Sequence, residues 1–339
     1  MRGWAFACGA LAALTFAGVA GGQTATGGDI QPAWSPDGTK IAFAREVGSH
    51  YEIYVMKATG GGFHALTHGA PDHSDPTWSP DGTRIAFSQL THGYGATLGG
   101  QVFVVAAGGS AKRRLSSGTG GYDELLGWSP DGKQLLFERI QDGIGAVYVE
   151  PSTGGPQKRL TPAGSDDYLA SFSPDGTKIA FARTAANAFG DIYVMNADGT
   201  DPKAIAHTTA DETDPIWSPS GKEIAFMSDR TGGHYEIWET SAAGGAARRL
   251  THTPGGAQNP SWSPDGKQIA FQSYINGQWQ IAVVDAAGGG QRTLTNSFGD
   301  NTSPTWSPDS KQIAFASTRN NTSQIFVMTA NGVGQKAVS

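Results

Sequence analysis

A short apolar pattern recurs along the chain at nearly constant intervals. It reads Ile-Ala-Phe or Leu-Leu-Phe and begins at Ile41, Ile85, Leu135, Ile179, Ile224, Ile269 and Ile313. Apolar runs of this length without polar alternation are typical of strands that are buried on both faces. A second apolar run, Ile53-Tyr54-Val55-Met56 in its first occurrence, follows in several repeats. The pattern therefore predicts many short strands.

An aromatic residue and a turn precede each apolar pattern. The first occurrence is Trp34-Ser35-Pro36-Asp37-Gly38, and the aromatic returns at Trp78, Trp128, Phe172, Trp217, Trp262 and Trp306. Proline fixes φ and glycine adopts positive φ without strain, so Ser-Pro-Asp-Gly predicts a tight turn between two strands. We interpret the motif as structural and not catalytic.

The spacing of the aromatics predicts the fold. The successive intervals are 44, 50, 44, 45, 45 and 44 residues, and a fixed period of 40 to 45 residues is typical of propellers. In the first repeat we expect strands at 32–35, 41–44, 53–56 and 63–66. The prediction is an all-β, seven-bladed β-propeller of four-stranded antiparallel blades over residues 23–339. The ring could close by packing of the last blade, with its own outer strand at 335–338, or by a strand from residues 24–30.

The first 22 residues differ from the rest. A positive start at Arg2, an apolar run from Trp4 to Val19 and small residues at its end predict a secretory signal peptide over residues 1–22. The alternative is an uncleaved anchor. The only cysteine, Cys8, lies in this segment, so the mature chain would have no disulfide.

Charge and export limit the classes of partner. The chain carries a net charge of −6, which argues against binding nucleic acid or an anionic membrane. We expect an exported, periplasmic or extracellular monomer that has no stable membrane insertion after cleavage of the signal peptide.

The repeat resembles a known family. The sequence Pro-x-Trp-Ser-Pro-Asp-Gly-x-x-Ile-Ala-Phe, followed by Glu-Ile-Tyr-Val-Met and Arg-Arg-Leu-Thr, is similar to the propeller repeat of TolB and related WD-like propellers, from about residue 28 to the end. TolB has an additional N-terminal α/β domain and six blades. The resemblance implies a periplasmic module that binds a protein or peptide, although a propeller fold does not define a function.

Acidic residues gather ahead of the aromatics, where the loops of a propeller meet on one face. Like charges there would attract basic groups. Alternatively, each acid accepts backbone hydrogen bonds within its own turn. One loop, 91–100, is longer than its counterparts and carries Tyr94. The candidate binding residues are Asp72, Asp75, Tyr94, Asp123, Asp167, Asp211, Glu212, Asp214 and Asp300, within a wider set that includes Asp29, Glu124, Asp166, Asn259 and Asn301.

Metal binding is a weaker hypothesis. His68, His207 and His252 each lie ten residues before an aromatic, and Asn296 takes this position in the last repeat. We expect no cofactor, while a divalent cation in the channel stays open because oxygen ligands are abundant.

Two functions remain after these observations. No Gly-x-Ser-x-Gly or His-Glu-x-x-His motif is present, which favours a non-enzymatic role. The first hypothesis is a binding or scaffold module for a protein, peptide or envelope polymer, including carbohydrate. The alternative is a metal-dependent polysaccharide lyase or hydrolase, similar to oligogalacturonate lyases.

Overall fold

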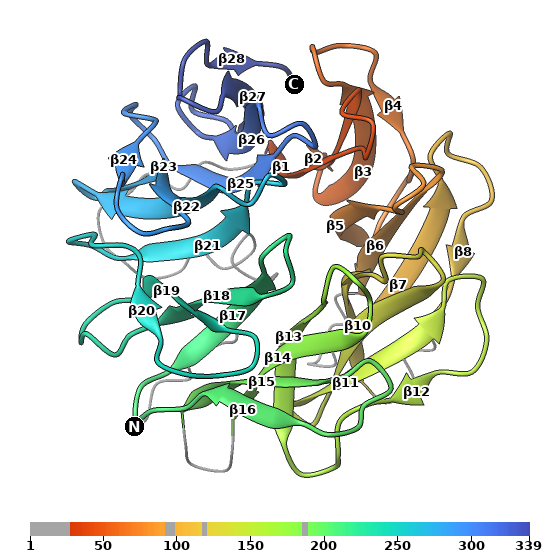
Figure 1. The fold of residues 1–339 in the computed structure, drawn as a ribbon. Helices are drawn as coiled ribbons and strands as arrows, with labels where there is room; N and C mark the ends of the chain where they lie inside the picture. The colour runs from red at the N-terminus through yellow and green to blue at the C-terminus, as the bar shows by residue number, and fades with distance from the viewer. Residues whose placement is uncertain (1–27, 92–98, 117–120, 185–188) are drawn as a thin grey trace.

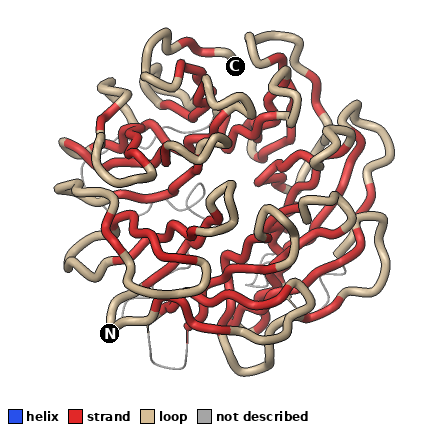
Figure 2. Tube along the Cα trace, in the orientation of Figure 1, coloured by secondary structure: helices blue, strands red, loops and turns tan. Residues whose placement is uncertain are grey.

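The computed structural model describes residues 28–91, 99–116, 121–184 and 189–339. These residues form an all-β ring of sheets around a central axis, without a helix in the described part (Figure 1; Figure 2). The predicted signal peptide and Tyr94 lie outside the described residues. In the part of the chain that is described, no helix is long and apolar enough to span a membrane.

Each repeat supplies four consecutive strands. The first strands, nearest the axis, are β1 (Asp29–Trp34), β5 (Asp72–Trp78), β9 (Tyr122–Trp128), β13 (Asp166–Phe172), β17 (Glu212–Trp217), β21 (Ala257–Trp262) and β25 (Asn301–Trp306). The second strands are β2 (Lys40–Val47), β6 (Arg84–Thr91), β10 (Gln134–Gln141), β14 (Lys178–Thr184), β18 (Glu223–Ser228), β22 (Gln268–Ile275) and β26 (Gln312–Ser317).

The third and fourth strands complete each unit. The third strands are β3 (His50–Lys57), β7 (Gly99–Ala106), β11 (Ile144–Pro151), β15 (Gly190–Asn196), β19 (Glu236–Ser241), β23 (Gln278–Asp285) and β27 (Gln324–Thr329). The fourth strands are β4 (His64–Ala65), β8 (Arg113–Arg114), β12 (Lys158–Arg159), β16 (Lys203–Ala206), β20 (Arg248–Arg249), β24 (Arg292–Thr293) and β28 (Lys336–Ala337).

Pairing within each unit is antiparallel. Five sheets contain four strands each, and one sheet of eight strands combines β5–β8 with β9–β12. Among the described residues, the two halves of the larger sheet are joined by a single parallel pair, Gly100 with Tyr122. The prediction of an all-β fold built from four-stranded antiparallel units is confirmed.

The recurring apolar pattern forms the core. Ile41, Ala42 and Phe43 on β2 are fully buried, and the corresponding phenylalanine of every repeat is also fully buried. These side chains pack between neighbouring units, as Phe87 does against Ala42 and Val55 of the preceding unit. The prediction that the second strand is buried on both faces is confirmed.

The aromatic and its turn connect neighbouring units. The Trp78 indole N–H donates to the carbonyl of Ala33 at 3.1 Å, one unit earlier in the chain. In the turn, Ser35 Oγ donates to Asp37 Oδ1 at 2.6 Å and Gly38 has a φ of 70°. The motif is therefore the tight turn that the sequence predicts.

Ring closure repeats the contact made between other units. The Trp34 indole N–H donates to the carbonyl of Thr305 at 3.2 Å, and the last unit has its own fourth strand, β28, paired with β27. Trp34 and Phe43 share a buried cluster with Ile325. The alternative was that residues 24–30 add a strand to the last unit. Among the described residues, the pairing of this segment with the last unit is one isolated parallel bridge between Gly28 and Ser323.

The first strands begin earlier than predicted. β1 starts at Asp29, where the sequence predicts Pro32. The cause is a bulge: the register between β1 and β2 shifts between Ile30 and Ala33, and pairing resumes before the bulge, where Asp29 lies opposite Arg45. Proline cannot donate to a ladder and is confined to bulges and edges, so Pro32 marks the bulge and not the start of the strand.

Candidate functional site: the central cavity

The acids predicted to form one binding face occupy three different positions. We number them from the aromatic of their repeat, so that Asp72, Asp123 and Asp75 represent positions −6, −5 and −3. The bulge of the first strand separates position −3 from the other two, and the side chains at the three positions make different contacts.

Acids at position −6 connect neighbouring units. Asp72 Oδ1 accepts a hydrogen bond from the backbone N–H of Tyr51 at 2.7 Å, at the start of the preceding third strand. Three further acids make the same contact with a residue 21 positions earlier: Asp166 with Gly145, Asp211 with Gly190, and Asp300 with Trp279. These carboxylates accept hydrogen bonds from backbone N–H groups at the ends of strands, which is the alternative to ligand binding that the sequence left open.

Acids at position −5 form buried ion pairs. Asp167 is fully buried and accepts from Arg183 Nε at 2.5 Å, and Asp123 is paired in the same way with Arg139. The guanidinium of Arg183 also lies over the rings of Phe181 and Tyr193. Removing one partner from such a pair leaves an uncompensated buried charge, so the contacts of these carboxylates lie within the protein.

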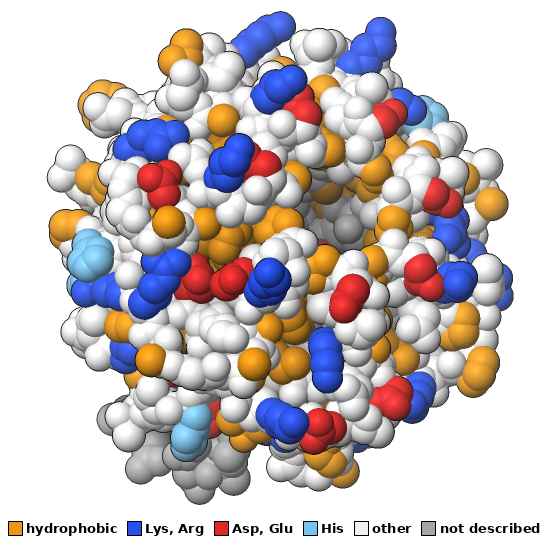
Figure 3. Space-filling view, in the orientation of Figure 1, with side chains coloured by type: hydrophobic (Ala, Val, Ile, Leu, Met, Phe, Trp, Pro, Cys, Tyr) orange, Lys and Arg blue, Asp and Glu red, His pale blue; other side chains and the backbone are white. Residues whose placement is uncertain are grey.

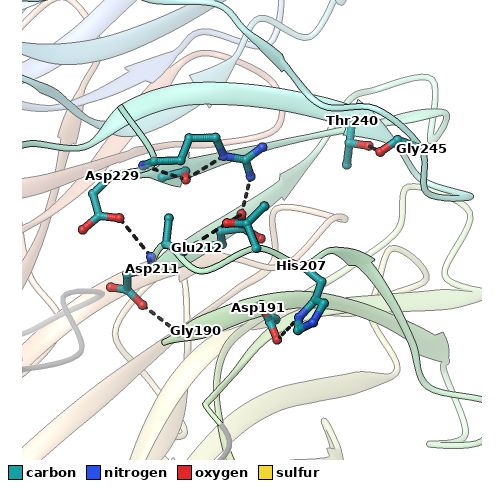
Figure 4. A network of polar contacts seen from close by, with 12 residues as sticks. Gly190, Asp191, His207, Asp211, Glu212, Asp229, Thr240 and Gly245 are labelled. Carbon is teal, nitrogen blue, oxygen red and sulfur yellow. Dashed lines mark hydrogen bonds and ion pairs between the residues drawn. The ribbon is translucent and has the colours of Figure 1, made fainter. Parts of the chain in front are cut away.

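Figure 4 shows both positions in the fifth repeat. Glu212 is fully buried, pairs with Arg230 and accepts from Thr208 Oγ1 at 2.8 Å. The adjacent Asp211 accepts a hydrogen bond from the Gly190 backbone N–H through its carboxylate. Its own backbone N–H donates to Asp229 Oδ1 at 2.9 Å. Burial raises the pKa of Glu212.

Residues at position −3 line a central cavity of about 690 Å³. The space-filling view shows the ring hollowed at its centre, with charged side chains of both signs spread around it (Figure 3). Six of the seven residues at this position have a φ between 50° and 55°. The seven, which we call the bulge ring, are Gln31, Asp75, Leu125, Leu169, Asp214, Asn259 and Ser303.

The cavity wall carries acids and no base. Asp75, Glu124, Asp214 and Asp300 line it, whereas no lysine, arginine or histidine is among the described residues of its wall. Amide and hydroxyl side chains such as Asn259 and Ser303 supply the other polar groups. The wall therefore becomes negatively charged as these carboxyls lose their protons, and no basic side chain among its described residues neutralises that charge.

Two carboxyls in this wall have strongly raised pKa values. Burial raises the pKa of Asp214 to about 7, and its carboxyl has no hydrogen-bond or ion-pair partner in the described part of the chain. Burial, followed by the nearby charge of Asp75, raises the pKa of Glu124 to about 8.

Asp75 has a partner on one oxygen only. Gln31 Nε2 donates to Asp75 Oδ1 at 2.6 Å, and Gln31 Oε1 accepts from the Asp75 backbone N–H at 3.0 Å. The other oxygen, Oδ2, is buried without a partner among the described residues. Burial raises the pKa of Asp75 to about 6.

The structure thus brings together part of the predicted set. Asp75, Asp214 and Asp300 line the cavity, whereas the cavity wall does not include Asp72, Asp123, Asp167, Asp211 or Glu212. Binding by these five stays a prediction. The sequence reasoning missed Gln31, Leu125 and Leu169 as cavity residues, although counting positions from each aromatic would have found them.

The histidine hypothesis gains no geometric support. His68, His207 and His252 are exposed, and His207 is hydrogen-bonded to Asp191 at 2.6 Å, a contact that raises its pKa. Within the described residues, no group of three or more His, Cys, Asp or Glu side chains is placed to hold a metal ion.

Comparison with known proteins identifies the family. The model of the TolB beta propeller domain matches residues 169–259 and 252–339, which together make up half of the chain. The chain belongs to the TolB β-propeller domain family. This assignment confirms the resemblance inferred from the repeat. No curated protein sequence matches the propeller.

Solved structures similar to the propeller include two TolB proteins and a lyase. Putative TolB from Agrobacterium tumefaciens is 25% identical, with a TM-score of 0.58 over 79% of this chain and 93% of that chain. TolB from Acinetobacter baumannii is 22% identical, with a TM-score of 0.57 over 85% and 76%. An oligogalacturonate lyase in complex with manganese is 17% identical, with a TM-score of 0.73 over 88% of both chains. At these identities, the last two show the fold alone.

Proposed function

We propose that this chain is an exported, seven-bladed propeller that binds a protein or peptide through its central cavity. The count of seven is supported by the seven runs of four antiparallel strands, because a single parallel pair between described residues joins the two halves of the eight-stranded sheet. Export rests on the predicted signal peptide of residues 1–22.

The observation that carries the binding role is the charge of the cavity wall. Among the described residues, four carboxyl groups and no base line a space of about 690 Å³, a volume within the range of small-ligand pockets. Such a site favours a positively charged group, for example a basic side chain or the amino terminus of a flexible segment. This role agrees with the protein-binding function that the family resemblance implies.

The same charge makes the enzymatic alternative less favourable. An oligogalacturonate is a polyanion, and the wall carboxyls would repel it unless a cation neutralised them. We therefore prefer the binding role, in which the acids attract the ligand directly. Metal analysis of the purified protein, together with an assay on uronate oligomers, tests the alternative.

The binding role is tested with the double variant Asp75→Asn/Asp214→Asn. A fluorescent lysine-rich peptide should bind the unmodified protein, and the double variant should weaken this binding by at least about tenfold. A glutamate-rich peptide of the same length is the comparison ligand. Equal binding of the lysine-rich peptide to both proteins would refute the assignment of the cavity.

Asp201→Asn is the matched control. Asp201 has a φ of 56°, close to that of Asp75 and Asp214, but it is exposed and pairs with Lys203 at 3.1 Å outside the cavity. The control therefore removes one negative charge at a residue with the same left-handed backbone conformation, and it leaves the cavity wall unchanged. It should bind the lysine-rich peptide as the unmodified protein does.

A further inference from the structure

The order of residues around the bulge ring follows from the topology. First strands of consecutive repeats contact each other, from β1 and β5 to β21 and β25, and β25 contacts β1. Within the bulge ring, Asp75 and Asp214 are therefore separated on one side by Leu125 and Leu169, and on the other side by Asn259, Ser303 and Gln31. The bulge ring thus has an apolar arc with a carboxyl group at each end, and Glu124, next to Leu125 on β9, adds a third carboxyl group to the wall on this side.

The opposite arc is polar and internally bonded. Asn259 Nδ2 donates to Gln272 Oε1 at 2.7 Å, and the same oxygen accepts from the Ser303 backbone N–H at 2.8 Å. Gln31 is held by its two hydrogen bonds with Asp75. The polar side chains of this arc are therefore hydrogen-bonded within the protein, whereas the Asp214 carboxyl and Asp75 Oδ2 have no partner within the described chain.

The fold does not require an acid at either end of the arc. The same bulge, with the same left-handed φ, is occupied by glutamine, leucine, asparagine and serine in other repeats. Asp75 and Asp214 are half-buried, and a carboxylate that is withdrawn from water without a partner destabilises a protein, so a neutral residue would stabilise the bulge better. The Asp214 carboxyl, which has no partner in the described chain, and the unpartnered Oδ2 of Asp75 therefore point to a ligand.

We propose that the apolar arc binds an aliphatic diammonium group, with one ammonium at Asp75 and the other at Asp214. The methylene chain between the two ammonium groups would lie along Leu125 and Leu169. This inference deepens the proposed function and rests on it, because it names the ligand group that the cavity accepts. The group could belong to a free α,ω-diamine, or to a polypeptide with an amino terminus near a lysine.

Calorimetric titration with simple amines tests the inference. The probes are α,ω-diamines of three to eight carbons and the monoamines of the same lengths, all at a pH of about 9, above the raised pKa values of Asp75, Asp214 and the neighbouring Glu124. At the best length, the diamine should bind at least about tenfold more tightly than the monoamine. In each single variant, Asp75→Asn or Asp214→Asn, the affinity for the diamine should fall to that for the monoamine. In Asp201→Asn the affinity for the diamine should not change.

Asparagine is suited to this bulge because Asn259 occupies it with a φ of 51°. Thermal unfolding of each variant will establish that the fold is intact. Equal affinities for diamine and monoamine, or diamine binding that survives both substitutions, would overturn the inference.

Two peptide arms distinguish the source of the group. A peptide with a free amino terminus and one lysine is compared with its N-acetylated form. If acetylation abolishes peptide binding, and the diamine binds more tightly than the monoamine but less tightly than the free peptide, the source is a polypeptide. If the diamine binds more tightly than the free peptide, the source is a free diamine. A different outcome is that neither the diamines nor these two peptides bind, while the lysine-rich peptide binds the unmodified protein and not the double variant. In that case the inference fails and the proposed function stands. If the lysine-rich peptide also binds the double variant, the proposed function fails as well.

Discussion

Replacing Asp214 by asparagine should stabilise the protein at high pH and not at low pH. The folded-state pKa of Asp214 is raised by burial from 3.8 to about 7. Between these two values the folded state binds more protons than the unfolded state, so the free energy of unfolding falls as the pH rises through this window. Below it, both states are protonated, and the carboxyl group makes no pH-dependent contribution. The asparagine side chain does not ionise, so the variant lacks this contribution to the pH dependence of the free energy of unfolding.

The size of the effect follows from the shift. A change of about three pKa units corresponds to roughly 4 kcal/mol at 1.36 kcal/mol per unit, which is an upper limit because the side chain borders a cavity that admits solvent. Halving it for screening leaves about 2 kcal/mol. With an unfolding entropy of about 2.1 cal/mol/K per residue, a chain of this length should gain roughly 3 °C in Tm.

The assay is thermal or urea unfolding of the unmodified protein, Asp214→Asn and the control Asp201→Asn between about pH 4 and about pH 9. The difference between Asp214→Asn and the unmodified protein should be small at the acidic end, rise between pH 4 and 7, and then stay constant. A difference that is independent of pH, or a variant that is less stable than the unmodified protein at pH 9, would refute the reasoning.

Three further predictions concern the other positions. Asp167→Ala leaves Arg183 without its partner at 2.5 Å and should cost about 3–5 kcal/mol in urea unfolding; a cost below 1 kcal/mol would contradict a buried pair. Gly82→Ala, at a φ of 69° with Pro36 no nearer than 3.6 Å to the new methyl group, should cost about 1–2 kcal/mol through backbone strain alone, and an unchanged midpoint would argue against that conformation. Because cations bind ionised carboxyls, diamine affinity should increase from about pH 5 to about pH 8, through the raised pKa values of Asp75 and Asp214, with Glu124 ionising at the upper end of this range; a flat titration, or one that is unchanged in Asp75→Asn and Asp214→Asn, would show that these two acids are not the ligands.

The sequence predicted the strands and the core well because each repeat carries its own local signals. The buried run from Ile41 to Phe43 and the positive φ of Gly38 both follow from residue type and spacing. Seven similar repeats make these signals consistent along the chain. The early start of β1 was missed because Pro32 resembles a strand boundary, while it lies in a bulge within the strand.

The candidate site was predicted only in part. Asp72, Asp123 and Asp75 are close in their repeats, and their shared charge suggested one shared surface. The bulge separates them: Asp123 is buried against Arg139, Asp72 caps Tyr51, and Asp75 reaches the cavity. A left-handed residue interrupts the alternation of side chains along a strand, and its position depends on pairing with the second strand, which no single repeat reveals.

This separation explains how the propeller can vary its ligand without losing its fold. Positions −6 and −5 hold units together or neutralise buried charges, so a change there affects stability. At position −3 the backbone conformation persists with glutamine, aspartate, leucine, asparagine or serine, so the fold tolerates different side chains there. Since all seven of these residues line one cavity, their order sets the charge and polarity that a ligand meets. The bulge ring is therefore the part of the repeat in which we expect specificity to be encoded.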